Sequence, residues 1–260
     1  MKVYAGLLAA ALVVVLGSVA SATPLLSVDF GQSQTPGYVQ PGFEAWHNTN
    51  FPPVGNGPVT KTIGSYTVGI ASSNDLGNTQ LVNASGDLAT TDSDTVVGRD
   101  RLNTSFPSGT WNNGAFSYGD LYRDFITCRK YMAVQIGGLD PTTEYSITFY
   151  AYDHNNTYTQ TFTDITGATA SNLNGANVAL GSIAWTKTTD FTGASNDIYA
   201  LTATATSDAS GRLTFRLNCP ASNVATDLNG LTLNIVPEPA SLSLLCLSGL
   251  MIAARRRRTS

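Results

Sequence analysis

The chain has 260 residues, of which 42% are hydrophobic and 12% are charged, and its formal net charge is −4. This apolar fraction excludes an intrinsically disordered chain, and the acidic balance argues against a nucleic-acid-binding protein. Thr, Gly, Asn and Ser dominate the polar positions, and few stretches have the Glu, Lys, Ala and Leu content of soluble helices. The composition therefore predicts an all-β fold.

The N-terminus has the three parts of a secretory signal peptide. Lys2 provides a short positive region, and the apolar run LLAAALVVVL follows at 7–16. Ala20-Ser21-Ala22 supplies the small residues of a cleavage site. We expect 1–22 to form a signal helix that is cleaved between Ala22 and Thr23. An uncleaved anchor helix is disfavoured, because the apolar run is short and a cleavage site follows it.

Residues 23–235 are expected to form one exported domain, an antiparallel β-sandwich of jelly-roll type. Several segments alternate apolar and polar residues with the two-residue period of a half-buried strand. Residues rich in turn formers, such as Gly137-Gly138 and Asn229-Gly230, separate them. The expected strands are 25–30, 66–71, 132–136, 145–152, 158–165, 199–205, 213–217 and 231–235.

The segment GLDPTTEY at 138–145 resembles the sandwich corner found in fibronectin type III modules. The resemblance implies that Leu139 plugs the core and that the Tyr145 hydroxyl bonds back to the backbone upstream. The body as a whole, with long aromatic and Asn-rich loops followed by paired strands, resembles galactose-binding-like jelly rolls, including malectin-type sugar binders. That resemblance implies a glycan ligand.

Two segments, 31–58 and 106–122, are expected to be long loops rich in aromatic residues. Loops of this length are uncommon in compact domains unless they are functional, and Trp and Tyr rings can stack on pyranose rings. Core packing is the equal alternative for Trp46 and Trp111 and the preferred interpretation for Trp185. A polar turn cap is the preferred interpretation of the Asp153-His154 pair. The candidate glycan-binding residues are Trp46, Trp111, Tyr118, Asp153 and His154.

No catalytic residue is assigned. The sequence lacks H-E-x-x-H, G-x-S-x-G, a P-loop and G-x-G-x-x-G. The charge alternations Arg99-Asp100-Arg101 and Arg123-Asp124 offer bidentate contacts to carboxylated sugars, but such patterns are more often exposed strand edges. A glycosidase needs only two carboxylates, so a polysaccharide-degrading enzyme, glycosidase or lyase, on a jelly-roll scaffold is the alternative function.

The exported body contains two cysteines, Cys128 and Cys219, since Cys246 lies in an apolar run near the C-terminus. A disulfide between them would close a loop of about ninety residues, worth roughly 4–5 kcal/mol, and two separate buried thiols are the alternative. These cysteines and the two distant histidines lack metal-ligand spacing, which argues that the chain has no zinc site. Calcium is the one candidate cofactor, held by carboxylates of Asp87, Asp92, Asp94 and Asp100, although a solvated acidic loop is the simpler interpretation.

The C-terminus has three successive features: Pro237-Glu238-Pro239, the apolar run 240–254 and an arginine cluster. As a helix, the apolar run would span about 22 Å, less than a hydrocarbon core of about 30 Å. We still expect a transmembrane helix at 240–254, because arginines can snorkel from its end. The arginines should remain cytoplasmic, so that the body lies outside. The cluster consists of Arg255, Arg256, Arg257 and Arg258.

These features, in this order over 236–258, resemble the PEP-CTERM sorting signal of bacterial exported proteins. The resemblance implies that Pro237, Glu238 and Pro239 form the motif recognised by exosortase, a membrane-embedded processing enzyme. It also implies export through the inner membrane, transient anchoring there, and a final location at the cell surface or in the extracellular matrix. We therefore expect a non-catalytic surface or matrix protein that binds glycan or exopolysaccharide.

Overall fold

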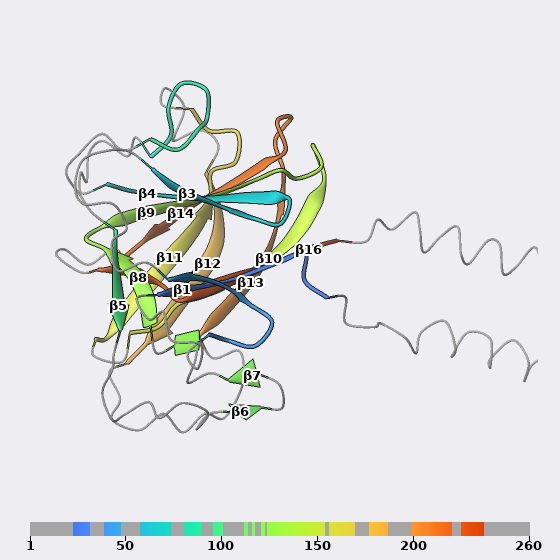
Figure 1. The fold of residues 1–260 in the computed structure, drawn as a ribbon. Coiled ribbons are helices and arrows are strands. Elements are labelled where there is room, and N and C mark those ends of the chain that lie inside the picture. Colours follow the sequence, from blue (N-terminus) through green and yellow to red (C-terminus); the bar gives the residue numbers. More distant parts are fainter. Residues whose placement is uncertain are drawn as a thin grey trace, which may run out of the picture.

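The computed structural model describes residues 23–31, 39–47, 58–73, 81–89, 96–100, 112–113, 116–117, 121–122, 124–153, 156–169, 177–186, 199–219 and 225–236. They form two packed β-sheets with a smaller sheet at one end (Figure 1). Among these residues, no helix has the length and apolar character needed to cross a membrane. The predicted signal helix 1–22 and the predicted transmembrane helix 240–254 lie outside the described residues.

The first sheet has five strands in the order β13-β10-β16-β1-β2. All neighbouring strands are antiparallel except β1 and β2, which run parallel and place Phe30 opposite Trp46 and Gly31 opposite His47. The strands are β13 (Ala200–Thr206), β10 (Glu144–Tyr150), β16 (Gly230–Ile235), β1 (Leu26–Gly31) and β2 (Glu44–His47).

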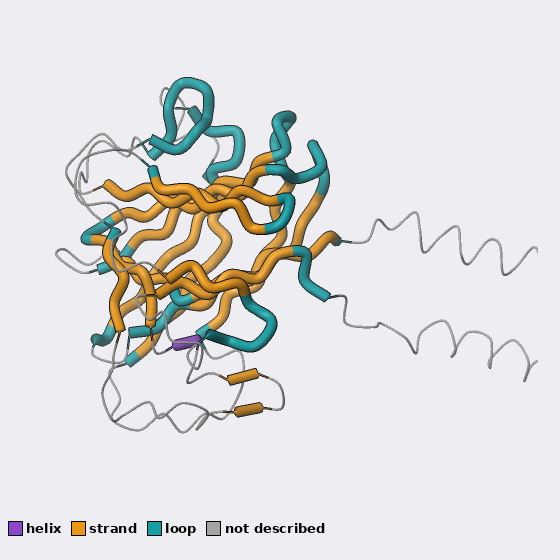
Figure 2. Tube along the Cα trace, viewed as in Figure 1, coloured by secondary structure: helices purple, strands orange, loops and turns teal. Residues whose placement is uncertain are grey.

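The second sheet has six antiparallel strands in the order β12-β11-β14-β9-β4-β3, and Figure 2 shows the strands of the two sheets as stacked orange layers. These strands are β12 (Val178–Trp185), β11 (Tyr158–Asp164), β14 (Arg212–Asn218), β9 (Tyr131–Gly137), β4 (Tyr66–Ser73) and β3 (Val59–Ile63). The smaller sheets contain β15 (Thr226–Leu228), β8 (Asp124–Cys128) and β5 (Val97–Asp100), and separately β6 (Asn112–Asn113) and β7 (Phe116–Ser117).

The core lies between the two large sheets and is built by alternation along the strands. Ile147 and Phe149 of β10 are fully buried, whereas Ser146 and Thr148, which alternate with them along the strand, are partly exposed. The Phe149 ring lies 5.0 Å from that of Phe162 and 5.1 Å from that of Phe215, both from the opposite sheet. The prediction of an all-β, mainly antiparallel sandwich is therefore confirmed for the described residues.

The strands expected from alternation correspond to β1, β4, β9, β10, β11, β13, β14 and β16. The predicted corner is also present. Leu139 is 6% exposed and lies in the core, and the Asp140 backbone N–H donates to the Tyr145 hydroxyl at 3.0 Å. Burial, as the largest cause, raises the pKa of the Tyr145 phenol, which therefore accepts this hydrogen bond as a neutral group. The corner fixes the start of β10.

The expectation of a continuous loop over 31–58 is wrong, because this segment contains β2. The strand has only four residues and pairs on one side with β1. Its outer edge is held by a hydrogen bond from the Lys61 ammonium of β3 to the Ala45 carbonyl, which joins the edges of the two large sheets. Such a short edge strand carries too few residues to show a clear two-residue period.

Candidate functional site

The predicted glycan-binding residues do not form one surface among the described residues. Trp46 is 5% exposed, and its ring lies 5.7 Å from that of Phe30 inside the core, so packing is its role. Asp153 is buried, and its carboxylate accepts a hydrogen bond from the Asn156 side chain across a turn, as the turn-cap interpretation predicts. Trp111, Tyr118 and His154 lie outside the described residues.

Cys128 and Cys219 are two separate buried thiols, which agrees with the alternative to a disulfide. The Cys128 thiol donates to the Tyr131 carbonyl at 3.2 Å, and the Cys219 thiol donates to the Thr159 carbonyl at 3.3 Å. Each sulfur is thus directed to the backbone of a different strand. Both cysteines nevertheless lie close to Thr226, which pairs with Cys128 and accepts a hydrogen bond from the Cys219 backbone.

Of the four carboxylates considered for calcium, the structure describes that of Asp87. The Asp87 carboxylate forms an ion pair with Arg212 at 2.5 Å, which directs it to a cation of the protein itself. Asp92 and Asp94 lie outside the described residues, and Asp100 is described only through its backbone in β5. Among the described residues, the Asp87 carboxylate is thus the one of these four whose partner is known, and that partner is the Arg212 guanidinium.

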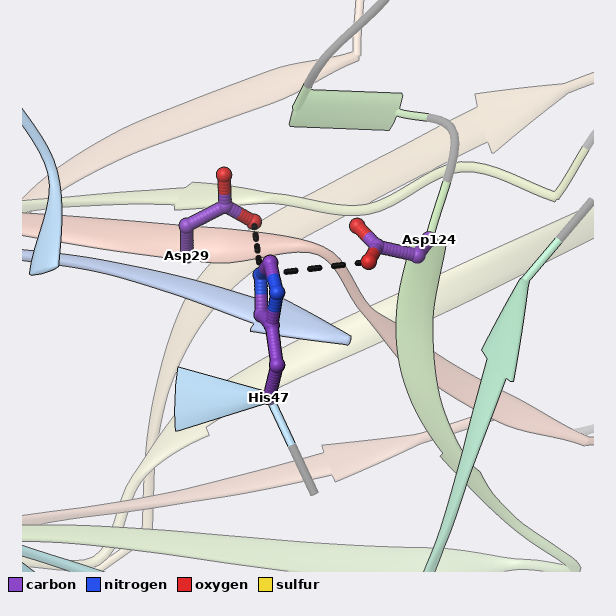
Figure 3. Close-up of side chains that lie close together, drawn as sticks. All are labelled: Asp29, His47 and Asp124. Carbon is purple, nitrogen blue, oxygen red and sulfur yellow. Dashed lines mark ion pairs between the residues drawn. The ribbon is translucent and has the colours of Figure 1, made fainter. Parts of the chain in front are cut away.

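The structure instead assembles three potential metal ligands that the sequence spacing did not connect: Asp29, His47 and Asp124 (Figure 3). The His47 Nε2 atom lies 3.6 Å from Asp29 Oδ1 and 3.8 Å from Asp124 Oδ2. One potential ligand atom from each residue lies within 4.8 Å of the others. The side chains of the two aspartates are 0% exposed and that of His47 is 3% exposed. The earlier interpretation of Arg123-Asp124 as an exposed edge is thus wrong for Asp124.

Strand pairing explains how these residues meet. Leu26, Val28 and Phe30 of β1 point into the core, so Asp29 and Gly31 share the other face of the strand. The parallel pairing of β1 with β2 places His47 opposite Gly31, next to Asp29 on that face. A Cβ atom on Gly31 would lie 2.1 Å from Asp124 Oδ2, so the Asp124 carboxyl occupies the space that glycine leaves.

A second feature is an open cleft of about 410 Å³ on the outer face of the six-stranded sheet. Thr60, Gly69 and Gln135 oppose one another across β3, β4 and β9, and thus share the face opposite to the core residues Ile70 and Val134. The cleft is lined by Pro58, Thr60, Thr67, Gly69, Asp87, Leu88, Gln135, Gly137, Gly138, Ser210 and Arg212.

One wall of this cleft is the segment 81–89, which polar contacts fix to the sheet. The Arg212 guanidinium donates to Asp87 Oδ1 at 2.5 Å, to Asp208 Oδ2 at 3.0 Å and to the Ser85 carbonyl at 3.1 Å. The Gln135 amide N–H₂ donates to the Gly86 carbonyl at 2.8 Å. These contacts preorganise the wall, so a ligand entering the cleft would not have to order it.

A smaller hollow of about 390 Å³ lies at the ends of β11 and β12 and is lined in part by Tyr158 and Trp185. The two rings lie 5.8 Å apart at 67°, and Trp185 is 3% exposed. Trp185 is therefore a packed core residue, as expected from the sequence. Tyr158, the other ring at this hollow, is partly exposed.

No protein-family model matches the sequence, and no curated protein matches it. Among solved structures, the CBM22-1 xylan-binding domain from Paenibacillus barcinonensis aligns over 57% of this chain and 89% of its own length, at 12% identity and a TM-score of 0.30. A family 35 carbohydrate-binding module from Clostridium thermocellum aligns over 43% of this chain and 78% of its own, at 14% identity and a TM-score of 0.27.

The CBM22-1–GH10 modules of an endo-1,4-beta-D-xylanase from Clostridium thermocellum align over 55% of this chain, at 10% identity and a TM-score of 0.33. This chain covers only 25% of that xylanase chain. Because all three TM-scores are below 0.5, these likenesses carry no conclusion about a ligand or an activity of this protein. The described residues by themselves define the class, an all-β sandwich with an open cleft on the outer face of its six-stranded sheet.

Proposed function

We propose that this chain is a non-catalytic, glycan-binding surface or matrix protein of a bacterium, a jelly-roll-type sandwich that is exported and sorted by its C-terminal signal. The observation that carries the binding half is the open cleft on β3, β4, β9 and β14, which is lined by both polar and apolar groups. A sugar ring presents hydroxyl groups around its rim and C–H groups on its faces. Thr60 and Thr67 offer hydroxyl groups to the rim, and Leu88 offers an apolar contact to a face.

The arrangement of charges in the cleft favours binding over hydrolysis. Glycosidases place two carboxyl groups on either side of the scissile bond, with space for the sugar between them. In this cleft the space between the Asp87 and Asp208 carboxylates is occupied by the Arg212 guanidinium, which contacts both. Both carboxylates thus serve to hold the wall in place, and the cleft retains uncharged groups for the ligand.

A substitution at Thr67 tests the cleft. Thr67 is exposed on β4 and lines the cleft, whereas Thr204 is exposed on β13 of the other sheet. We expect Thr67→Lys to weaken binding of the full chain to neutral polysaccharides at least tenfold, because the long side chain fills the cleft, which corresponds to about 1.4 kcal/mol. Thr204→Lys makes the same change of charge and should bind like the unmodified chain. Affinity electrophoresis in xylan, galactan and β-glucan gels measures both.

Three results would contradict the binding proposal. The first is an absence of retardation in every polysaccharide gel, and the second is equal weakening by Thr67→Lys and Thr204→Lys. The third is release of reducing sugar by the unmodified chain, which would favour the alternative of a polysaccharide-degrading enzyme. Loss of that release in Thr67→Lys alone would then assign the activity to the cleft.

The sorting half of the proposal rests on the C-terminal sequence. We expect Glu238→Ala to leave the protein unprocessed and retained in the inner membrane, because the change removes the acidic residue of the Pro-Glu-Pro motif. Immunoblotting of membrane, surface and medium fractions with an antibody against the sandwich measures both size and location. A Glu44→Ala variant removes an acid from the exposed start of β2 and serves as the control. Normal processing and location of Glu238→Ala would contradict the sorting proposal.

A further inference from the structure

We infer that Asp29, His47 and Asp124 bind a divalent transition-metal ion, of which Zn²⁺ is the best match, and that this ion ties β1, β2 and β8 together. This site is separate from the open cleft on the six-stranded sheet, and it is independent of the proposed glycan binding. Figure 3 shows the two carboxylates directed at the same edge of the imidazole ring.

The distances between the side chains suit a shared ion better than direct hydrogen bonds. The separations of 3.6 Å and 3.8 Å from His47 Nε2 exceed the 2.7–3.2 Å range of N–H···O hydrogen bonds. A tetrahedral ion with bonds of about 2.0–2.2 Å holds its ligand atoms about 3.3–3.6 Å apart, which is close to the two separations measured from His47 Nε2. The three ligand atoms, all within 4.8 Å of one another, thus lie near the spacing that a shared ion would impose.

The burial and the charge of the two carboxylates also favour a bound cation. Two carboxylates are costly to bury unless a cation accompanies them, and the side chains of Asp29 and Asp124 are both 0% exposed. A divalent ion bound by the neutral His47 imidazole would place a positive charge of two beside these carboxylates.

The kinds of ligand atom select the kind of metal. Ca²⁺ and Mg²⁺ prefer shells made of oxygen, whereas an imidazole nitrogen suits zinc and its neighbours in the first transition row. One imidazole and two carboxylates form a mixed N/O set without sulfur. Among the described residues, the sulfurs of Cys128 and Cys219 are directed to backbone carbonyls instead. Zn²⁺ is therefore preferred over Ca²⁺, and soft ions such as Cu⁺ are disfavoured.

The surroundings of the triad hold the ligands in place. Asp29 Oδ2 accepts a hydrogen bond from the Gln40 backbone at 2.7 Å, which fixes the rotation of this carboxylate. Asn229 is fully buried; its side-chain amide donates to the Asp124 carbonyl at 2.9 Å and accepts from the Tyr152 backbone at 2.7 Å. Partners of this kind, which orient the ligands, are typical of metal sites. The absence of a side chain on Gly31 supplies the space for Asp124.

The position of the site indicates a structural role. Asp29 and His47 belong to the five-stranded sheet, and Asp124 belongs to the three-stranded sheet at its end. All three side chains are at least nine-tenths buried, so a polysaccharide could not reach the ion. Metal binding would therefore stabilise the folded chain, because the unfolded chain does not hold the three ligands together.

The test uses the full chain, freed of metal with a chelator and then titrated separately with Zn²⁺, Mn²⁺ and Ca²⁺. We expect one Zn²⁺ per chain, and a rise in Tm of about 5–10 °C when free Zn²⁺ exceeds its Kd a hundredfold. Mn²⁺ should bind more weakly, and Ca²⁺ should not bind here. Asp124→Asn and Gly31→Ala should weaken Zn²⁺ binding at least tenfold. Asp153→Asn alters another buried aspartate and should bind Zn²⁺ normally.

X-ray absorption of the zinc-loaded full chain tests the ligands without any substitution, so it decides the matter even if a variant fails to fold. We expect one imidazole and oxygen ligands, and the same spectrum in His154→Gln, which removes the only other histidine. The inference is overturned if the folded chain binds neither Zn²⁺ nor Mn²⁺, or binds Ca²⁺ alone. Sulfur ligands, or equal Zn²⁺ affinity in Asp124→Asn and the unmodified chain, would also overturn it.

Discussion

Replacement of Phe149 by alanine is expected to lower the free energy of unfolding by about 3–5 kcal/mol. Phe149 is 0% exposed at the centre of β10, and its ring contacts those of Phe162 and Phe215 across the interface of the two sheets. Truncation removes apolar area from the core and leaves a cavity, because strands on both sides are held in register and close only in part. A loss of this size is a large fraction of the stability of a typical domain.

Urea unfolding of the full chain, followed by tryptophan fluorescence, measures this effect. Phe149→Leu keeps most of the apolar volume and should cost about 1–2 kcal/mol. Thr148→Ala changes the neighbouring, partly exposed position, where it removes a 2.8 Å hydrogen bond to Thr202, and should cost about 1 kcal/mol or less. A cost below 1 kcal/mol for Phe149→Ala would contradict the described core.

Gly211→Ala should be the most damaging change at a turn, with an expected loss of about 3–4 kcal/mol. Gly211 has a φ of 70°, which an alanine adopts only with strain. A Cβ atom there would also lie 2.1 Å from the Leu139 carbonyl oxygen, which belongs to the backbone and cannot rotate away. The hydrogen bond from the Leu139 N–H to the Gly211 carbonyl, at 3.1 Å, joins this turn to the corner before β10.

Gly167 provides a matched control for that substitution. It has a φ of 75° but no atom within 4 Å of a Cβ position, so Gly167→Ala adds backbone strain without a clash. Its expected cost is about 1 kcal/mol. Because Arg212 follows Gly211 directly, the glycan affinity should fall in Gly211→Ala and remain unchanged in Gly167→Ala. Equal stability of the two variants would show that the close approach to Leu139 is absent.

The strands that were predicted from the sequence are those with one face in the core and one in a polar environment. In β10, Tyr145, Ile147 and Phe149 alternate with Ser146 and Thr148, so the buried face is visible in the sequence itself. The corner before β10 was predicted because Leu139 and Tyr145 have roles that depend on local spacing alone.

Strands with a different environment were not predicted. Every residue of β8 is buried, so the strand has no polar face and no alternation. In β12 the pattern is broken by Gly181, where the register with β11 shifts and the φ is 148°. β2 is too short to show a period. In each of these strands tertiary packing, which a single sequence does not display, decides the conformation.

The triad of Asp29, His47 and Asp124 shows why a search by spacing missed a metal site. The ligands lie far apart in the chain, and they meet only through the parallel pairing of β1 with β2 and the packing of β8 on β1. Asp29 is an acidic residue between the apolar residues Val28 and Phe30 of an expected strand, and this is the one signal in the sequence that pointed to it. The open cleft on the six-stranded sheet likewise depends on Arg212 and Asp87, which are 125 residues apart.

Hydrogen exchange of the full chain, with and without the polysaccharide that binds it most tightly, tests the glycan-binding cleft most directly. We expect slower exchange in 58–69 and 81–89, which form the floor and one wall of the cleft, and no change in 199–206 on the other sheet. Slower exchange confined to the segments around Trp111, Tyr118 and His154, with 58–69 and 81–89 unaffected, would place the glycan elsewhere and contradict the account.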